Sequence, residues 1–365
     1  MKKCSYCGKD YPDAVERCEI DAETLVEVGL NEKPLPLPYK GSPPPKLEAP
    51  PRPTVLDLSE IGNAFELREG FSRPNWKLIR QLIKNDISPE SHSQAWTDAA
   101  FQWAEQIRAD LGGEYNLLWS DQFILVTALE QEKARSLLQF SERTLDHINE
   151  SLQDAAWRSG LGKHLLFLFV DLDDYYQYIA DFYRDGVYPT TSGVLLGRGY
   201  VHIAMPAGEG RQIRRVLTHE LAHNVVVHLP LPAWLNEGVA QTFERTAIDR
   251  PEPFLDHDLR DRHLAFWNNA NIQKFWAGTS FYDPGDSNEL SYNLAEIMVN
   301  LLNPKPSNFA DFLKAARPED AGQTASLDCL GADLGSVMGT FLGEGNWRPN
   351  RKAIAECWAA RKKKN

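Results

Sequence analysis

A proline-rich segment divides the chain into a short head and a long body. Nine prolines fall between residues 31 and 53, where the sequence contains KPLPLPYKGSPPPKLEAPPRP. Proline lacks a backbone N–H and fixes φ, so this stretch forms neither helices nor ladders and favours extended, semi-rigid conformations. We interpret residues 29–54 as a linker, and a proline-motif ligand is the alternative. The linker separates a head, residues 1–28, from the rest of the chain.

The composition is that of an ordinary globular protein with one large core. Of 365 residues, 42% are hydrophobic and 25% are charged. The net charge of −12 argues against nucleic-acid binding through a basic field, and the basic run at 361–364 is interpreted as a solvated end. No run of 18 apolar residues is present, so we expect no membrane span.

The body changes from strand patterns to helix patterns along its length. Residues 55–112 are expected to be helical, because aromatic and apolar residues recur at helical spacing before a glycine pair. From residue 211 onward nearly the whole pattern is helical. Between these regions a long helix is expected at about 130–157. Strands are expected at 115–119, 123–128 and 164–170, and as an edge hairpin at 192–206.

This order predicts an α+β architecture, in which a mixed sheet with an edge strand is followed by a helical C-terminal half. We divide the body into three parts. They are a helical segment packed on the main domain at 55–112, the main domain at 113–345, and a C-terminal helix with a basic tail at 346–365.

Two histidines stand four residues apart in the sequence THELAH, residues 218–223. The surrounding apolar residues have helical spacing, and residues four apart share one face of a helix. The imidazoles of His219 and His223 can therefore converge on one metal ion. Glu220 projects about 100° away, where its carboxylate can reach a water bound to that ion. The alternative is a chance motif, since the chain has nine histidines.

A third ligand is needed, because a catalytic zinc takes three protein ligands and one exchangeable water. Glu237 lies 14 residues after His223, near the start of the next expected helix, and an antiparallel return would bring it toward the histidines. HELAH followed by WLNEG resembles the gluzincin metallopeptidases, distantly the aminopeptidase N family and more closely the compact peptidase MA-like domains. This resemblance implies that His219, His223 and Glu237 bind zinc and that Glu220 is the general base.

The resemblance extends to residues outside the motif. Glu244 matches an outer acidic position, and such groups orient metal ligands. ELSYNLAEIMVNLL, residues 289–302, resembles the segment that carries a tyrosine beside the metal, and Tyr292 stands at that position. A phenol there donates a hydrogen bond to the oxyanion as it forms. GYVHIAMP, residues 199–206, stands where the family keeps an edge strand that pairs with substrate, but it lacks the exopeptidase signature.

The resemblance implies a zincin-like fold and a zinc-dependent metallopeptidase that hydrolyses peptide or protein substrates with metal-activated water. Two alternatives stay open. One is a zincin scaffold of little or no activity that binds proteins through its head, and the other is a zinc hydrolase for a non-peptide amide. The complete set of ligands, base and tyrosine favours activity, because degenerate scaffolds commonly lose one of these groups.

Four other histidines are weaker candidates for the site. His228 lies near a helix end, where a capping or surface position is favoured over ligation. His202 lies in the expected edge strand, where it faces the cleft or packs in the core. His257 and His263 lie in a charged stretch and are expected to be solvated.

The head contains three of the five cysteines. Cys4-x2-Cys7 is followed by Cys18-x2-Asp21, and a Cys-x2-Cys turn presents two thiolates to a metal. This resembles short bacterial zinc-ribbon heads, which implies a structural zinc on Cys4, Cys7 and Cys18 with Asp21 as the fourth ligand, and docking to a protein partner. A redox-active or disordered leader is the alternative. An odd cysteine count and no apolar segment after the start favour the cytoplasm.

Overall fold

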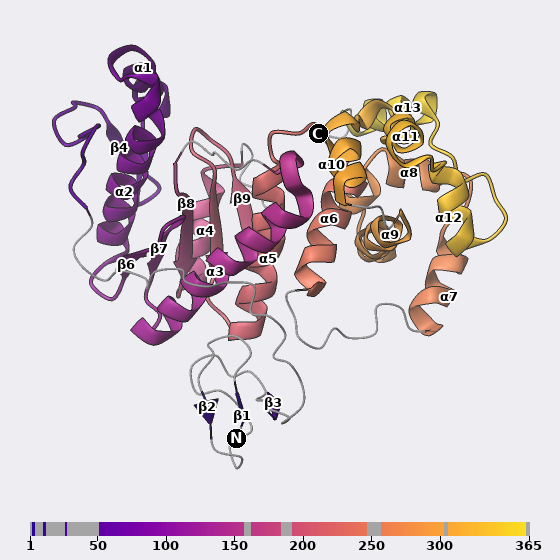
Figure 1. Cartoon of the computed structure of the whole chain (residues 1–365), viewed down its shortest axis with the longest axis horizontal. Coiled ribbons are helices and arrows are strands. Elements are labelled where there is room, and N and C mark those ends of the chain that lie inside the picture. The colour runs from indigo at the N-terminus through magenta and orange to yellow at the C-terminus, as the bar shows by residue number, and fades with distance from the viewer. Residues whose placement is uncertain are drawn as a thin grey trace. The chain divides into compact units, whose positions relative to one another are not determined.

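The computed structural model describes residues 2–3, 10–11, 26–27, 51–156, 162–183, 192–246, 257–302 and 306–362. The zinc-ribbon prediction for Cys4, Cys7, Cys18 and Asp21 lies outside the described residues, as does most of the linker. Within the head, three short strands form an antiparallel sheet in the order β2-β1-β3 (Figure 1). They are β1 (Lys2–Lys3), β2 (Asp10–Tyr11) and β3 (Val26–Glu27).

The chain forms two compact units, which are described separately. The first contains residues 1–146 and 158–220, and the second contains residues 147–157 and 221–365. The division passes through two helices, α3 (Gln131–Leu152) and α5 (Gly210–Val226). All five strands of the main sheet belong to the first unit, and the described part of the second unit is helical. The α+β prediction is therefore confirmed.

The first unit is built on a five-stranded mixed sheet with the order β6-β7-β8-β10-β9. The three inner strands are parallel, and the two outer strands are antiparallel to their neighbours. The strands predicted from the apolar runs are all present. They are β6 (Asn116–Trp119), β7 (Phe123–Thr127), β8 (His164–Phe169), β9 (Val194–Leu196) and β10 (His202–Pro206).

Strand β10 is an internal strand of this sheet. It pairs in parallel with β8 on one side, and Ala204 pairs with Val194 of β9 on the other. The predicted hairpin is therefore confirmed, but the prediction that residues 199–206 form the edge strand is wrong. The edge strand on this side of the sheet is β9, the first strand of the predicted hairpin.

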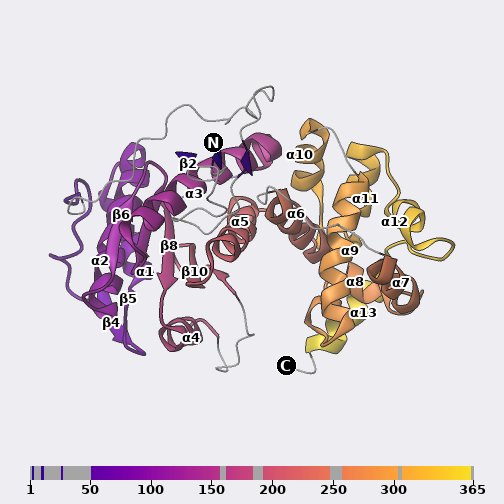
Figure 2. The ribbon, with the colours of Figure 1, turned by 90° about the horizontal axis from the view of Figure 1, so that it is seen from below.

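Helices cover both faces of the sheet (Figures 1 and 2). On one face, α2 and its neighbours form a continuous core with alternate strand residues such as Ile124 and Phe167. On the other face, Val216 of α5 lies against Gly193 beside Met205. The elements of the first face are β4 (Phe65–Arg68), β5 (Phe71–Pro74), α1 (Trp76–Asp86), η1 (Pro89–Ser91), α2 (His92–Leu111) and α4 (Leu172–Ala180).

The helical prediction for 55–112 is wrong at residues 65–74, which form the hairpin β4–β5. Its turn contains Glu69 and Gly70, both with positive φ. Residues 65–68, FELR, do alternate apolar and charged side chains, but a run of four residues is a weak signal for a strand. The hairpin is held from outside, because Asp110 of α2 accepts a hydrogen bond from the backbone of Ser72 at 2.6 Å.

The second unit is a set of helices around α9 (Asp286–Leu302). In Figures 1 and 2, α9 lies among the other helices of this unit. Leu290, Leu294 and Met298 of α9 are completely buried. The other elements are η2 (Gln153–Ala155), α6 (Ala233–Thr246), α7 (His257–Phe266), α8 (Ile272–Trp276), η3 (Ser280–Tyr282), α10 (Pro306–Ala315), η4 (Pro318–Asp320), α11 (Gln323–Ala325), η5 (Ser326–Leu330), α12 (Leu334–Leu342) and α13 (Arg351–Lys362).

Helices α6 and α9 approach each other closely at Gly238. A Cβ atom at this position would lie 2.5 Å from the carbonyl oxygen of Ala295 and 2.8 Å from Val299 Cγ2. Glycine is therefore needed for this contact, because a side chain would push the two helices apart. The contact places the turn that carries Glu237 directly against α9.

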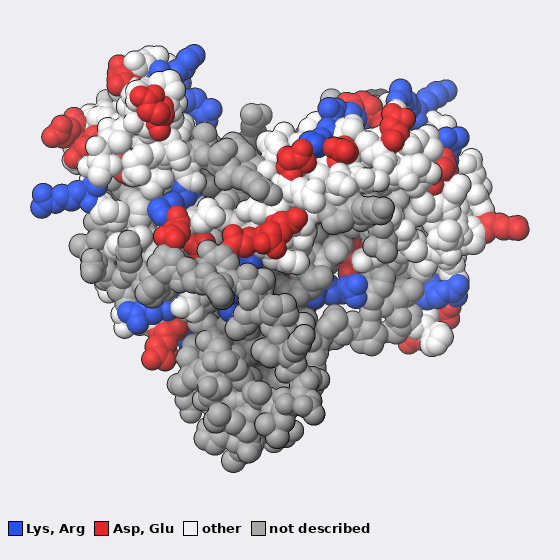
Figure 3. All heavy atoms as spheres, viewed as in Figure 1, with Lys and Arg blue, Asp and Glu red and all other residues white. Residues whose placement is uncertain are grey.

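Acidic and basic side chains are interspersed over the described part of the face in Figure 3. Among the described residues, no helix combines the length and the apolar character that crossing a bilayer requires.

Candidate metal centre

Three side chains from α5 and α6 converge on a common point. One ligand atom from each of His219, His223 and Glu237 lies within 4.8 Å of the other two. The Nε2 atom of His223 is 3.4 Å from Oε2 of Glu237. Ligand atoms bonded at about 2.0–2.1 Å to a tetrahedral ion are about 3.3 Å apart, so this pair already has the spacing of two ligands of one ion.

The local sequence explains how the two helices bring these residues together. His219 and His223 are one helical turn apart on α5. After α5 the chain turns through a short connection with two prolines, and α6 begins at Ala233. The carbonyl oxygen of Pro232 accepts hydrogen bonds from the backbone of Leu235 and Asn236 at 3.0 Å, which starts the helix. Glu237 then lies within the first two turns of α6.

Asn236 orients one of the two imidazoles. Its Oδ1 atom lies 3.1 Å from Nδ1 of His223. An amide oxygen only accepts, so Nδ1 carries the proton and the Nε2 lone pair faces Glu237. Such outer partners fix the tautomer and the ring direction of metal-binding histidines. Asn236 was not among the predicted site residues, although its place directly before Glu237 was the available signal.

The donor set tests whether a metal fits. With Nδ1 protonated, His223 Nε2 and Glu237 Oε2 are two acceptors 3.4 Å apart, an arrangement that a shared cation stabilises. Two imidazoles and one carboxylate are typical of hydrolytic zinc sites, whereas magnesium and calcium prefer oxygen ligands. The residues therefore fit a zinc ion with one coordination position left for an exchangeable ligand.

The site is shielded but remains accessible to solvent. The side chain of His223 is 13% exposed and that of Glu237 is 21% exposed. Glu220, which follows His219 on α5, is buried. A carboxylate at this position is protected from bulk water yet adjacent to the ligand cluster in sequence and on the helix.

Tyr292 lies in the first half of α9 and is half-buried. The rings of Tyr292 and Phe281 pack edge to face, with their centroids 5.1 Å apart. Because α9 packs on α6 at Gly238, Tyr292 is carried by the helix next to the one that carries Glu237. The packing of the ring limits its rotation.

Glu244 lies on α6 near an ion pair whose carboxylate is buried. Arg245 pairs with Glu296 of α9, whose side chain is 7% exposed. Burial raises the pKa of Glu296 to about 7, the nearby guanidinium of Arg245 opposes this shift, and the charge of Glu244 adds to it. This buried carboxyl was not predicted from the sequence, because Glu296 lies in an otherwise apolar run of α9.

His202 is a core residue. It is completely buried, its Nε2 atom accepts a hydrogen bond from the Tyr178 hydroxyl at 2.8 Å, and its Nδ1 atom donates to the Tyr200 carbonyl at 3.1 Å. Burial lowers the pKa of His202 to about 3, so the ring is neutral at neutral pH. Of the two interpretations, packing is therefore the one that the structure shows. His228 is exposed just beyond the end of α5.

The expectation of solvation is confirmed for His257, which is exposed at the start of α7, and is wrong for His263. His263 is completely buried. It is satisfied by Trp267 at 3.0 Å and by Asn293 at 2.8 Å. Charged neighbours in the sequence suggested a surface position, but the ring of His263 is directed inward to Trp267 and to Asn293 of α9.

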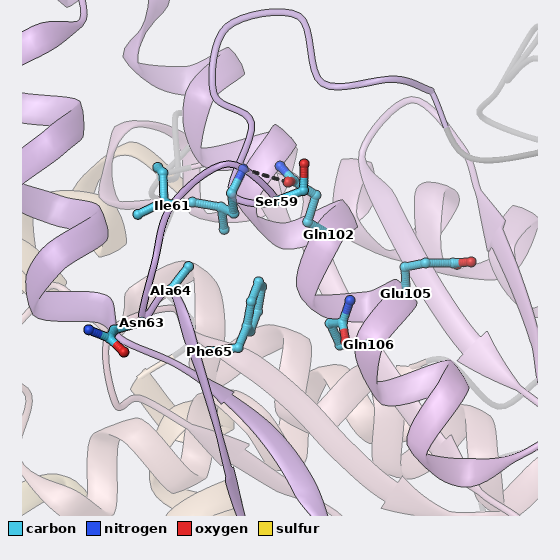
Figure 4. A pocket seen from close by; sticks show the side chains of 9 residues that line it. Ser59, Ile61, Asn63, Ala64, Phe65, Gln102, Glu105 and Gln106 are labelled. Carbon is cyan, nitrogen blue, oxygen red and sulfur yellow. Dashed lines mark hydrogen bonds between the residues drawn. The ribbon is translucent and has the colours of Figure 1, made fainter.

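A separate pocket of about 330 Å³ lies in the first unit between α2 and the preceding loop (Figure 4). The side-chain amide of Gln102 accepts a hydrogen bond from the backbone N–H of Leu58 at 2.7 Å and donates one to the carbonyl oxygen of Leu56 at 2.8 Å. Glu105, its one ionisable lining residue, pairs with Arg108 at 2.7 Å. Gln102 therefore holds the loop, and Glu105 is paired within α2.

The fold and the site together define an α+β protein with a candidate His-His-Glu metal centre. No protein-family model matches the sequence, and no curated protein is significantly similar to it. The motif and the geometry of the site are therefore the basis for assigning a function.

Proposed function

We propose that this chain is a zinc-dependent metallopeptidase of the gluzincin type with a zincin-like fold. The observation that carries the proposal is the convergence of His219, His223 and Glu237, whose ligand atoms lie within 4.8 Å of one another. Glu220 and Tyr292 complete the set of residues that such a reaction uses. The resemblance of HELAH and WLNEG to this group of enzymes supports the same assignment.

In the proposed mechanism, zinc when bound supplies Lewis-acid polarisation of the scissile carbonyl and lowers the pKa of water toward about 7. Glu220 takes a proton from the attacking water and passes it to the leaving amine. Tyr292 donates its phenolic proton in a hydrogen bond to the developing oxyanion. Asn236 keeps the His223 ring in the tautomer that directs Nε2 toward Glu237.

An extended substrate has a place to bind at the sheet edge. Among the described residues, β9 pairs with β10 alone, so its other side has backbone groups for an added strand. We assign the substrate-pairing role to β9 instead of β10. A peptide held in this way suits an endopeptidase, in keeping with the missing exopeptidase signature.

The test of this function combines metal analysis with a chelator-sensitive assay on a peptide library. Glu220→Gln should retain zinc and lose turnover by about 10²-fold or more, because the base is removed while the ligands remain. Glu209→Gln, an exposed residue before α5, is the matched control and should keep full turnover. If Glu220→Gln cleaves peptides as fast as the parent, the role of Glu220 is wrong.

The same experiment separates the alternatives. Zinc binding without hydrolysis of any peptide would favour a scaffold that binds proteins through its head, and hydrolysis of other amides alone would favour a non-peptide substrate. The proposal includes a structural zinc on Cys4, Cys7, Cys18 and Asp21 and a protein partner there. Wild-type protein should then contain two zinc ions per chain, and a Cys4→Ser/Cys7→Ser variant one.

We also place the enzyme in the cytoplasm. The described cysteines, Cys329 and Cys357, are free thiols, as a reducing compartment allows.

A further inference from the structure

Two consecutive residues of α7 bind the part of α9 that carries Tyr292. The Nε2 atom of His263 lies 2.8 Å from Oδ1 of Asn293, the residue directly after Tyr292. Glu289, three residues before Tyr292, accepts two hydrogen bonds from the guanidinium of Arg262, at 2.8 and 2.7 Å. Contacts from a single helix therefore bracket Tyr292 along α9.

The two contacts differ in how strongly they constrain α9. The side chain of Arg262 is 39% exposed and that of Glu289 is 61% exposed, and ion pairs between exposed groups contribute little. His263 is completely buried, so losing its partner would leave a polar group without water to replace it. The hydrogen bond from His263 is therefore the stronger constraint on this turn.

The direction of that hydrogen bond is fixed. The indole Nε1–H of Trp267 donates to Nδ1 of His263 at 3.0 Å, and an indole nitrogen never accepts. Nε2 of His263 therefore carries the ring proton and donates to Oδ1 of Asn293. Burial lowers the pKa of His263, which keeps the ring neutral and preserves this arrangement at neutral pH.

We propose that His263 is a positioning residue for Tyr292, acting through Asn293 to hold the turn of α9 from which the phenol reaches the oxyanion. This inference rests on the proposed peptidase function. Phe281 packs against the ring of Tyr292, whereas His263 sets the position of the backbone that carries the ring. A shift of about 1 Å in a catalytic group is enough to slow a reaction about 10²-fold.

The test is a double-mutant cycle on full-length protein. Asn293→Leu removes the acceptor and keeps a good helix former, whereas Asn293→Asp keeps an acceptor for His263. Each is made with Tyr292 and with Tyr292→Phe. Asn300→Leu makes the same chemical change about two turns along α9, where the native amide binds the helix's own backbone at 2.8 Å. For every protein, kcat, KM and zinc content are measured with one cleaved peptide.

Asn293→Leu should lower kcat about tenfold, Tyr292→Phe should lower kcat about 10²-fold, and KM and zinc content should stay within about twofold. In the Tyr292→Phe background, Asn293→Leu should change kcat less than about twofold, because the group it positions is gone. Asn293→Asp and Asn300→Leu should stay within about threefold of wild type.

Equal losses in both backgrounds, a change in KM in place of kcat, or an equal loss for Asn300→Leu would show a merely structural role. These outcomes overturn the positioning role and leave the peptidase intact. A wild-type protein that holds zinc and hydrolyses no peptide overturns the peptidase, and with it the positioning role.

Discussion

The Nε2 atom of His223 lies 3.4 Å from the Oε2 atom of Glu237, although the two residues are carried by different helices. The proton of this imidazole lies on Nδ1, which donates a hydrogen bond to Oδ1 of Asn236. Two lone-pair acceptors at this distance are stabilised by a cation that both can bind. The proposed zinc site thus follows from one hydrogen bond as well as from three ligands.

The first prediction concerns Asn236. Asn236→Leu should weaken zinc binding about 10–100-fold, because His223 loses the partner that fixes its tautomer and ring direction. Asn236→Asp keeps an acceptor and should bind zinc within about threefold of wild type. Affinity is measured by competition with a chromophoric chelator, with Cys4→Ser/Cys7→Ser present throughout to remove the head from the titration. Unchanged affinity in Asn236→Leu would contradict the orienting role.

The second prediction concerns the contact between α6 and α9. Gly238→Ala should destabilise the protein by about 1–3 kcal/mol, because the new methyl group meets the Ala295 carbonyl oxygen at 2.5 Å. It should also weaken zinc binding, since α6 carries Glu237. The matched control is Gly339→Ala on α12, where the nearest atom is Trp347 Cδ1 at 3.7 Å.

Gly339→Ala should stabilise the protein by up to about 1 kcal/mol through helix propensity. Both variants are compared by urea unfolding and by the chelator competition. If Gly238→Ala is as stable as Gly339→Ala and binds zinc equally well, the close helix contact has no role in placing Glu237.

The sequence predicted those features that depend on near neighbours in the chain. Apolar runs identified β7 and β8, and the four-residue spacing placed His219 and His223 on one face of α5. Hydrophobic periodicity reports the face that each element buries, and a helix or strand repeats its geometry along its own length. The convergence of Glu237 with these histidines was also foreseeable, because the connection is short.

Features that depend on partners distant in the sequence were not predictable. His263 is buried because Trp267 and Asn293 satisfy both ring nitrogens, and Asn293 is 30 residues away. The pairing of Arg245 with Glu296 joins two helices 51 residues apart. Strand β9 is at the edge because β10 pairs with β8 and so lies between β8 and β9. Periodicity describes one element at a time and contains no information about which second element covers it.

The third prediction is a pH dependence from Glu296. Its pKa is raised by burial from 4.5 to about 7, so between these values the folded protein holds a proton that the unfolded chain releases. The contribution of this group to stability is therefore present below pH 4.5 and is lost as the pH rises to 7. Its size is at most about 3 kcal/mol.

Glu296→Gln removes this titration. Relative to the variant, wild-type protein should lose stability between pH 5 and pH 7.5 in urea unfolding. Glu356→Gln on α13, where the side chain is 67% exposed, is the control and should follow wild type at both pH values. Parallel pH profiles for wild type and Glu296→Gln would show that Glu296 ionises normally.

The fourth prediction has the opposite sign and concerns His202 in the first unit. Its pKa is lowered by burial from 6.5 to about 3, so in this range the unfolded chain takes up a proton that the folded protein excludes. The stability contributed by neutral His202 is full above pH 6.5 and falls as the pH decreases, by about 2 kcal/mol at pH 5. Hydrogen exchange of β8 amides, corrected for the intrinsic pH dependence, measures this loss.

The informative variant is Tyr178→Phe/His202→Phe, because it replaces both partners of the 2.8 Å hydrogen bond with apolar rings and leaves no unpaired hydroxyl. Protection of β8 in this variant should fall less between pH 7 and pH 5 than in wild type. Burial also lowers the pKa of His164 in β8, to about 4, so that part of the loss remains in both proteins. His92→Gln is the control, because His92 binds the Ile87 carbonyl at 3.0 Å and a glutamine amide still donates there. An equal loss of β8 protection at low pH in the double variant and in wild type would show that groups other than His202 cause it.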